Sequence, residues 1–192
     1  IYVDNKNTVW LAGGGGADSQ ILKYTTDGKF VMQIGKKGAR LRPGNERPRI
    51  SDPNSLDMES FGHPTKVVVD AKTNEAYVSD GYVNHRVVVM TRQGQFITEY
   101  PEFGRASGLA IDKNDVIYTA DSESTAKVHP GWLRGVRIGS LKDGKVTVFI
   151  PPHALPNSAD GTMGEGIAID DAGNVYTAEA QLRGITKYVK GQ

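Results

Sequence analysis

The chain has 192 residues, no cysteine and a formal net charge of +1 at pH 7. This length suits one domain with a substantial core, and the missing cysteines exclude disulfides and thiolate metal sites. The balanced charge argues against nucleic acid as a partner, and no apolar run is long enough to span a membrane.

The first 35 residues contain four short apolar runs separated by turn signals, which is the pattern of strands in an antiparallel meander. The runs read IYVD (1–4), VWLAG (9–13), QILKYT (20–25) and FVMQIG (30–35). No window longer than about a dozen residues carries apolar positions at helical spacing. We therefore expect strands and turns throughout.

The same order of runs returns three more times along the chain. First runs end at Asp4, Asp70, Asp112 and Asp170, and second runs end at Gly13, Asp80, Asp121 and Glu179. Sheets of four strands repeated around an axis form a β-propeller. We predict an all-β propeller with about four visible blades, at residues 1–35, 64–101, 106–150 and 164–190. The first-run aspartates are expected to accept backbone N–H groups of the turns that follow them.

The links between runs differ in length, and the extra residues gather in two link types. These are the links between second and third runs and the links between units, which emerge on the same face of an up-and-down blade. The longest are Lys36–His63, Asp121–Arg134 and Pro151–Gly164, and all four histidines, His63, His85, His129 and His153, fall in such links. Long loops gathered on one face mark the working surface of a repeat protein. We call this predicted surface the long-loop face.

The last unit has no fourth run, because the chain stops at Gln192. Closed propellers commonly complete their last blade with a strand from the opposite terminus, which removes open sheet edges. We expect this chain to be the C-terminal part of a six-bladed propeller. Its open blade edges would then be covered by upstream blades or by another chain.

The second unit carries the most specific motifs: Pro64-Thr65 opening a strand, then YVSDGY (77–82), Asn84 and Arg86. With these residues the unit resembles the NHL-repeat propellers, and within them the catalytic domain of peptidyl-alpha-hydroxyglycine alpha-amidating lyase. Units three and four look like bacterial lyase-like propellers of unassigned role. The resemblance implies a zinc ion held by three histidines in the central channel, a catalytic tyrosine and arginine, and a periplasmic or secreted location.

The resemblance carries over only in part. Tyr82 matches the family tyrosine, and Arg86 is the candidate catalytic arginine. Two of the zinc-histidine positions hold Ser107 and Glu165, and the third would precede Ile1. A serine does not suit zinc, so a standard zinc lyase is disfavoured. Ser107 remains a candidate ligand-binding residue of the channel.

Glu165 stands between two glycines at the entry to the last blade. Its carboxylate is a candidate ligand for a hard cation such as calcium, as in gluconolactonase-like propellers. The alternative is a channel carboxylate that accepts hydrogen bonds from neighbouring backbone.

Each remaining candidate also has a structural alternative. Tyr82 can be a packing residue on the Gly81 turn, and Arg86 can pair with Asp80 or with a neighbouring blade. His63 and His85 are candidate ligand contacts, although loop histidines are usually solvated. Trp132 is the best aromatic anchor for a ligand or partner, or else it covers a blade edge.

Two further segments have a simple interpretation. Lys36–Arg49 is rich in basic residues without interleaved aromatics, which favours a solvated lid with internal ion pairs over a nucleic-acid surface. Gly13–Gly16 lacks the lysine-serine pair of a phosphate loop, so it is interpreted as a flexible connection.

Two functional hypotheses follow. The first is a propeller that binds a small molecule, a peptide or a protein on its long-loop face. The second is a lyase-like or lactonase-like enzyme with zinc or calcium in the central channel, completed by residues outside this chain. The missing histidines favour the first hypothesis.

Overall fold

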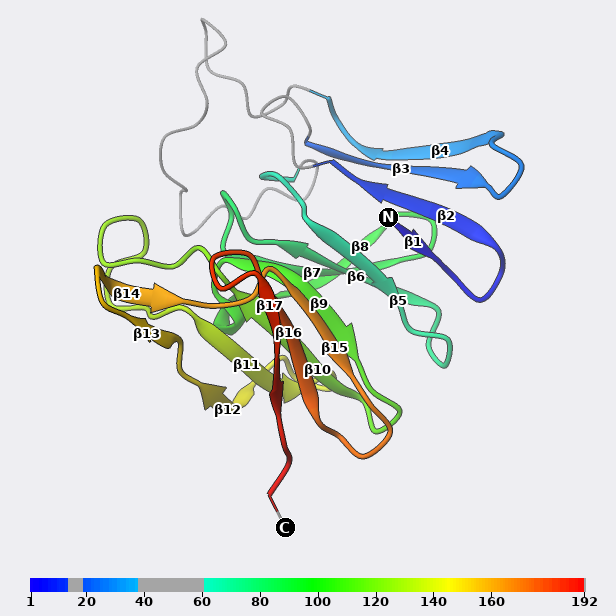
Figure 1. The fold of residues 1–192 in the computed structure, drawn as a ribbon. Helices are drawn as coiled ribbons and strands as arrows, with labels where there is room; N and C mark the ends of the chain where they lie inside the picture. The colour runs from blue at the N-terminus through cyan, green and yellow to red at the C-terminus, as the bar shows by residue number, and fades with distance from the viewer. Residues whose placement is uncertain (14–18, 38–60, 192) are drawn as a thin grey trace, which may run out of the picture.

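The computed structural model describes residues 1–13, 19–37 and 61–191, and apart from one short 3-10 turn at Pro101–Phe103 its elements are all strands. Successive sheets follow one another around a common axis (Figure 1). No helix in these ranges is long and apolar enough to cross a membrane. Most of the expected glycine connection, Gly13–Gly16, and most of the expected basic lid, Lys36–Arg49, lie outside the described residues.

Three four-stranded sheets and one three-stranded sheet make up the four blades, and within each sheet neighbouring strands pair antiparallel in chain order. Blade 1 contains β1 (Tyr2–Val3), β2 (Thr8–Ala12), β3 (Gln20–Thr25) and β4 (Phe30–Gly35), and blade 2 contains β5 (Lys66–Val69), β6 (Glu75–Asp80), β7 (Arg86–Thr91) and β8 (Phe96–Tyr100). Blade 3 contains β9 (Ala106–Ile111), β10 (Val116–Asp121), β11 (Gly135–Ser140) and β12 (Val146–Ile150), and blade 4 contains β15 (Gly166–Ile169), β16 (Val175–Glu179) and β17 (Gly184–Tyr188). The predicted all-β propeller is confirmed, including the missing fourth strand of blade 4.

The link between blades 3 and 4 was expected to be a loop, and this prediction is wrong. It contains a hairpin of β13 (His153–Leu155) and β14 (Ser158–Thr162), drawn at the side of the molecule in Figure 1. The two strands are too short for an alternating apolar pattern to show in the sequence. His153 therefore begins a strand and does not lie in a loop.

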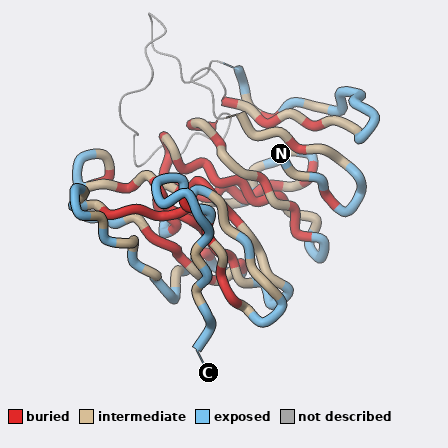
Figure 2. The backbone as a smooth tube through the Cα atoms, in the orientation of Figure 1, coloured by how far each residue is buried: buried red, intermediate tan, exposed pale blue. Residues whose placement is uncertain are grey.

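Buried positions, red in Figure 2, lie along the strands of the blades, and buried side chains of neighbouring blades pack together. Three apolar clusters lie at the three blade junctions. The first joins Trp10 and Ile21 to Val67 and Val78, the second joins Tyr77 and Val87 to Leu109 and Ile117, and the third joins Tyr118 and Val136 to Met163 and Val175. The first strands of the blades, β1, β5, β9 and β15, contact one another in that order, so they lie nearest the axis.

The first-run aspartates close the turns that follow them, as predicted. Asp112 accepts backbone N–H groups from Asn114 at 2.8 Å and Val116 at 3.0 Å, and its second oxygen accepts the Tyr118 hydroxyl at 3.0 Å. Equivalent bonds surround Asp4, Asp70 and Asp170. Hydrogen bonds from Asn174 lower the pKa of Asp170 to about 2. These aspartates have a structural role in shaping the turns.

The described parts of the long links meet on one side of the molecule. The Gly62 amide donates to Asp80, and Arg105 donates to the carbonyl of Tyr82. The hairpin joins the same group of loops, since the Ala126 amide donates to Asp160. Arg134 also donates to the hairpin, at the carbonyl of Gly161. For these residues, the expected long-loop face exists.

A pair of isoleucines tests the packing between blades. Ile117 is fully buried at the junction of blades 2 and 3, whereas Ile1 is 82% exposed at the start of the chain. We expect Ile117→Ala to lower the free energy of unfolding by roughly 2–5 kcal/mol, because it leaves a cavity at the junction. The matched Ile1→Ala change should cost less than about 0.5 kcal/mol. Urea unfolding of both variants measures this, and equal losses would contradict the blade arrangement.

Candidate functional site

Tyr82 and Glu165 join blades 2 and 4 on the long-loop face. The Tyr82 hydroxyl donates to Glu165 Oε2 at 2.9 Å, although the two residues are 83 positions apart. Gly81 makes this placement possible, because a Cβ there would overlap the backbone of Ala106 at the start of β9. Burial, followed by the charge of Glu165, raises the pKa of Tyr82, so the phenol stays protonated. The structure thus brings together the predicted tyrosine and the predicted metal-binding carboxylate.

Arg105 supports this corner from blade 3. Its guanidinium donates to the carbonyl oxygens of Tyr82 at 2.6 Å and Glu123 at 2.7 Å. The Glu123 side chain is half-buried, and burial together with the charge of Glu165 raises its pKa against the opposing effect of Arg105. Tyr82, Glu123 and Glu165 are therefore close enough to influence one another electrostatically. We call Tyr82, Arg105, Glu123 and Glu165 the mouth cluster.

Ser107 occupies one position where the lyase resemblance would place a zinc histidine. It is 7% exposed, donates to the carbonyl of Ala120 at 3.0 Å and accepts a hydrogen bond from Ser122 at 2.9 Å. Glu165 has the Tyr82 hydroxyl as a partner. Within the described ranges, no group of three or more His, Cys, Asp or Glu side chains is arranged to hold a metal. The described donor set therefore does not fit a three-histidine zinc site.

Arg86 follows the structural alternative that the sequence left open. Its side chain is 3% exposed, and it pairs with Asp80 at 3.0 Å and with Glu99 at 2.8 Å. Asp80 also accepts hydrogen bonds from Gly62 and Asn84. A buried arginine with two carboxylate partners holds the blade together and is not presented to a ligand.

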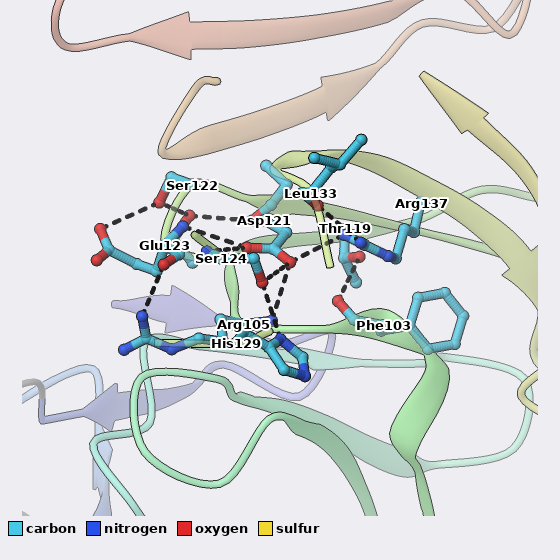
Figure 3. A network of polar contacts seen from close by, with 12 residues as sticks. Phe103, Arg105, Thr119, Asp121, Ser122, Glu123, Ser124, His129, Leu133 and Arg137 are labelled. Atoms are coloured by element: carbon cyan, nitrogen blue, oxygen red, sulfur yellow. Dashed lines mark hydrogen bonds and ion pairs between the residues drawn. The ribbon is translucent and has the colours of Figure 1, made fainter. Parts of the chain in front are cut away.

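Asp121, at the end of β10, is the organising carboxylate of the loop at 122–134 (Figure 3). It accepts backbone N–H groups from Arg105, Glu123 and Ser124. It also accepts the Ser124 hydroxyl at 2.6 Å and the guanidinium of Arg137 at 2.9 Å. Because Arg105 and Glu123 are bound at their backbones, the buried Asp121 positions two members of the mouth cluster.

No motif in the sequence indicates that Arg105, Glu123 or Asp121 belongs to a site. The only available signal was that second runs recur with an acid at their end, followed in unit three by a Ser-Glu-Ser stretch at 122–124. That pattern indicates a turn in which acidic and hydroxyl side chains accept hydrogen bonds from nearby backbone N–H groups. It does not show which distant loop the turn will meet.

The histidines have different environments, and the expectation that they are solvated is wrong for two of them. His85 and His129 are 5% and 8% exposed, with ring centres 4.0 Å apart. His63 is half-buried, and its Nε2 atom is buried without a hydrogen-bond partner among the described residues. A hydrogen bond of 2.8 Å joins His153 Nε2 to the Tyr188 hydroxyl. The same nitrogen lies 3.4 Å from Glu179 Oε1.

Trp132 lies in the loop at 122–134 and is partly exposed. Its ring stacks on His129 at 4.6 Å with an interplanar angle of 8°. The guanidinium of Arg137 covers the ring at 4.7 Å from its centre. Trp132 is therefore built into blade 3 and does not project freely as an anchor for a partner.

Comparison with known proteins agrees with this geometry. The NHL repeat family profile matches residues 61–90, which span β5, β6 and most of β7. The chain is a β-propeller with a match to the NHL repeat in its second blade.

Curated proteins similar to this chain include the peptidylglycine alpha-amidating monooxygenase of Rattus norvegicus, 41% identical over 107 residues. The Mus musculus peptidyl-glycine alpha-amidating monooxygenase is 34% identical over 104 residues. Each match covers 53% of this chain and 10% of the relative, so the similarity is partial.

Solved structures show the same architecture in other propellers. The WD40 β-propeller domain of Doa1 matches with a TM-score of 0.61 at 13% identity, over 99% of this chain and 49% of that chain. A protein of unknown function from Bacteroides caccae matches with a TM-score of 0.61 at 13% identity, over 96% of this chain and 55% of that one. At this identity the likeness supports the fold alone.

The role of Asp121 can be tested by making the same substitution at this buried aspartate and at an exposed one. Asp121→Asn leaves the buried Arg137 without its charged partner, so we expect a loss of roughly 3–5 kcal/mol in the free energy of unfolding. Asp171 is exposed, and Asp171→Asn should change stability by less than about 0.5 kcal/mol. Urea unfolding followed by circular dichroism measures both, and a small loss in the Asp121 variant would argue against its organising role.

Proposed function

We propose that this propeller binds a small cationic ligand, or a cationic group of a peptide, at the mouth cluster. The observation that carries the proposal is the Tyr82–Glu165 hydrogen bond of 2.9 Å, which joins blades 2 and 4 on the long-loop face. Two carboxyl groups, Glu123 and Glu165, lie within electrostatic range of each other at this point. A ligand cation would relieve their mutual repulsion.

The mouth cluster has two carboxyl groups against one guanidinium, and Arg134 is a further cation within electrostatic range of Glu123. Arg105 is the basic member, and its guanidinium donates to two backbone carbonyl oxygens. Glu165 is exposed, so a ligand can reach its carboxylate from solvent. The Tyr82 hydroxyl would hold the carboxylate in place while a ligand ammonium or guanidinium approaches.

The proposal can be tested with Nα-acetyl-L-argininamide and its uncharged analogue Nα-acetyl-L-citrullinamide, here called argininamide and citrullinamide, by isothermal titration calorimetry or amide chemical-shift changes. We expect argininamide to bind at least tenfold more tightly than citrullinamide. Glu165→Gln should weaken argininamide binding by at least tenfold, which corresponds to about 1.4 kcal/mol. The exposed Asp171→Asn variant, away from the mouth cluster, should bind as the unmodified chain does. Equal binding of the two probes would count against the proposal.

The second candidate is the lyase-like or lactonase-like enzyme, favoured by the partial similarity to peptidylglycine alpha-amidating monooxygenases. In that case residues outside this chain complete a zinc or calcium site that includes Glu165. Metal analysis of the complete protein separates the two functions. Stoichiometric metal that is lost in a Glu165→Ala variant supports the enzyme, and a metal-free protein that binds argininamide supports the binding function.

We also propose that the outer face of blade 4 packs against a further blade or another chain. Tyr77 and Tyr118 pack against the following blade in the second and third clusters, and each shares with Tyr176 its position relative to the acid that ends the second strand. Tyr176 lines a groove of about 260 Å³ together with Ala168, Ala178 and Ile185. The face of blade 4 thus has the apolar composition of a blade junction without the neighbour.

The expected result is that the isolated 192-residue chain self-associates through this face. Light scattering should report a mass above that of the monomer, and Ile185→Asp should shift the mass toward the monomer. A stable monomer of the unmodified chain would contradict this proposal while leaving the ligand site untouched.

A further inference from the structure

A column of stacked side chains connects the loop of blade 2 to the loop of blade 3. His85 lies between β6 and β7, and its ring centre is 4.0 Å from that of His129 in the loop at 122–134. His129 stacks in turn on Trp132 at 4.6 Å, and Trp132 lies under the guanidinium of Arg137. These four side chains hold the tip of the blade 3 loop against blade 2. We call them the ring column.

His85 is buried in a way that depends on its being uncharged. It is 5% exposed, and neither ring nitrogen has a hydrogen-bond partner among the described residues. Buried polar atoms are usually hydrogen-bonded, so each unpartnered nitrogen already carries a desolvation cost. A proton on this ring would place a full charge where no described group solvates it.

The hydrogen bonds of Ser124 determine the tautomer of His129. Ser124 Oγ lies 2.6 Å from Asp121, whose carboxylate can only accept, so the serine hydroxyl donates to it. The 3.0 Å contact between Ser124 Oγ and His129 Nδ1 must then have Nδ1–H as its donor. In neutral His129 the second nitrogen, Nε2, is left without a hydrogen and can accept a proton.

The charged groups that face the two rings are mostly cationic. His85 faces Arg105 from the start of blade 3 and His129 from the loop. His129 faces Asp121 at the end of β10, Arg137 on β11 and Arg105. Burial lowers the pKa of His85 to about 3, with further lowering by His129 and Arg105. Burial also lowers the pKa of His129, and the opposing effect of Asp121 does not cancel it.

We propose that the ring column is an acid-sensitive latch, which holds the loop at 122–134 on blade 2 while both imidazoles are neutral and releases it, exposing Trp132, when they are protonated. Two imidazolium rings at 4.0 Å beside two guanidinium groups would repel one another, and the stacking would be lost.

The direction of the pH dependence follows from the lowered pKa values. A base whose pKa is lower in the folded state contributes stability above its ordinary pKa, which is about 6.5 for histidine. That contribution is lost as the pH falls toward the folded value, about 3 for His85. The latch is therefore closed at pH 7 and opens progressively in the acid range between these values. Because Glu123 lies on the same loop, opening also moves one member of the mouth cluster.

The two tryptophans of the chain make the latch measurable. Trp10 is fully buried at the junction of blades 1 and 2, so a Trp10→Phe background leaves Trp132 as the single reporter. We expect acrylamide quenching of Trp132 to rise at least twofold between pH 7 and pH 4, and to reverse on return to pH 7. Far-UV circular dichroism should stay unchanged over the same range, because the blades remain folded.

Variants at the histidines separate the latch from general acid unfolding. In His85→Gln and His129→Gln chains the added charge cannot form, so the acid-induced rise in quenching should shrink by at least half in each. The matched His153→Gln change removes a histidine outside the ring column and should leave the pH profile as it is. If Trp10→Phe does not fold, fluorine NMR of the 5-fluorotryptophan-labelled chain resolves the two tryptophans instead.

Three outcomes would overturn the latch. These are no pH response of Trp132, the same response in the His85→Gln and His129→Gln chains, and a response that coincides with loss of the circular dichroism signal. None of these measurements uses a ligand, so the result is independent of the proposed binding function.

Discussion

The structure depends on one constraint, namely that each sheet has two apolar faces and both must be covered. Blades 2 and 3 meet this requirement by packing against a neighbour on each side, with Tyr77 and Tyr118 at successive junctions. This stacking turns the blades around an axis and brings their first strands together. Because every blade has the same up-and-down order, the links between second and third strands and the links between blades emerge on one face.

Buried carboxylates at the ends of second strands then organise that face. Asp80 pairs with Arg86, and Asp121 pairs with Arg137, so each acid has a guanidinium from its own blade. In blade 4 the equivalent Glu179 is 2% exposed and has His153, from the inserted hairpin, in place of an arginine. Asp80 and Asp121 also accept loop backbone amides, which makes these loops part of the folded structure.

The candidate site is assembled from residues of three blades, so no single repeat contains it. Tyr82 comes from blade 2, Arg105 and Glu123 from blade 3, and Glu165 from the start of blade 4. Arg105 donates to the carbonyl of Tyr82 and the Tyr82 hydroxyl donates to Glu165, so blade packing determines the spacing of these groups. The ring column also depends on blade packing, because its two imidazoles belong to different blades and meet only when these blades are stacked.

The sequence by itself determined the fold class, the number of visible blades, the missing fourth strand and the turn-closing role of aspartates such as Asp112. These follow from local signals, since alternating apolar runs and turn residues act over a few neighbouring positions. Only the tertiary structure decided which residues meet: that Arg86 is buried between two acids, that His85 and His129 stack, and that Tyr82 reaches Glu165. It also revealed the hairpin at β13 and β14, whose strands are too short to leave a pattern. Contacts between blades join positions far apart in the chain, and their partners depend on the packing of whole sheets, which no local pattern encodes.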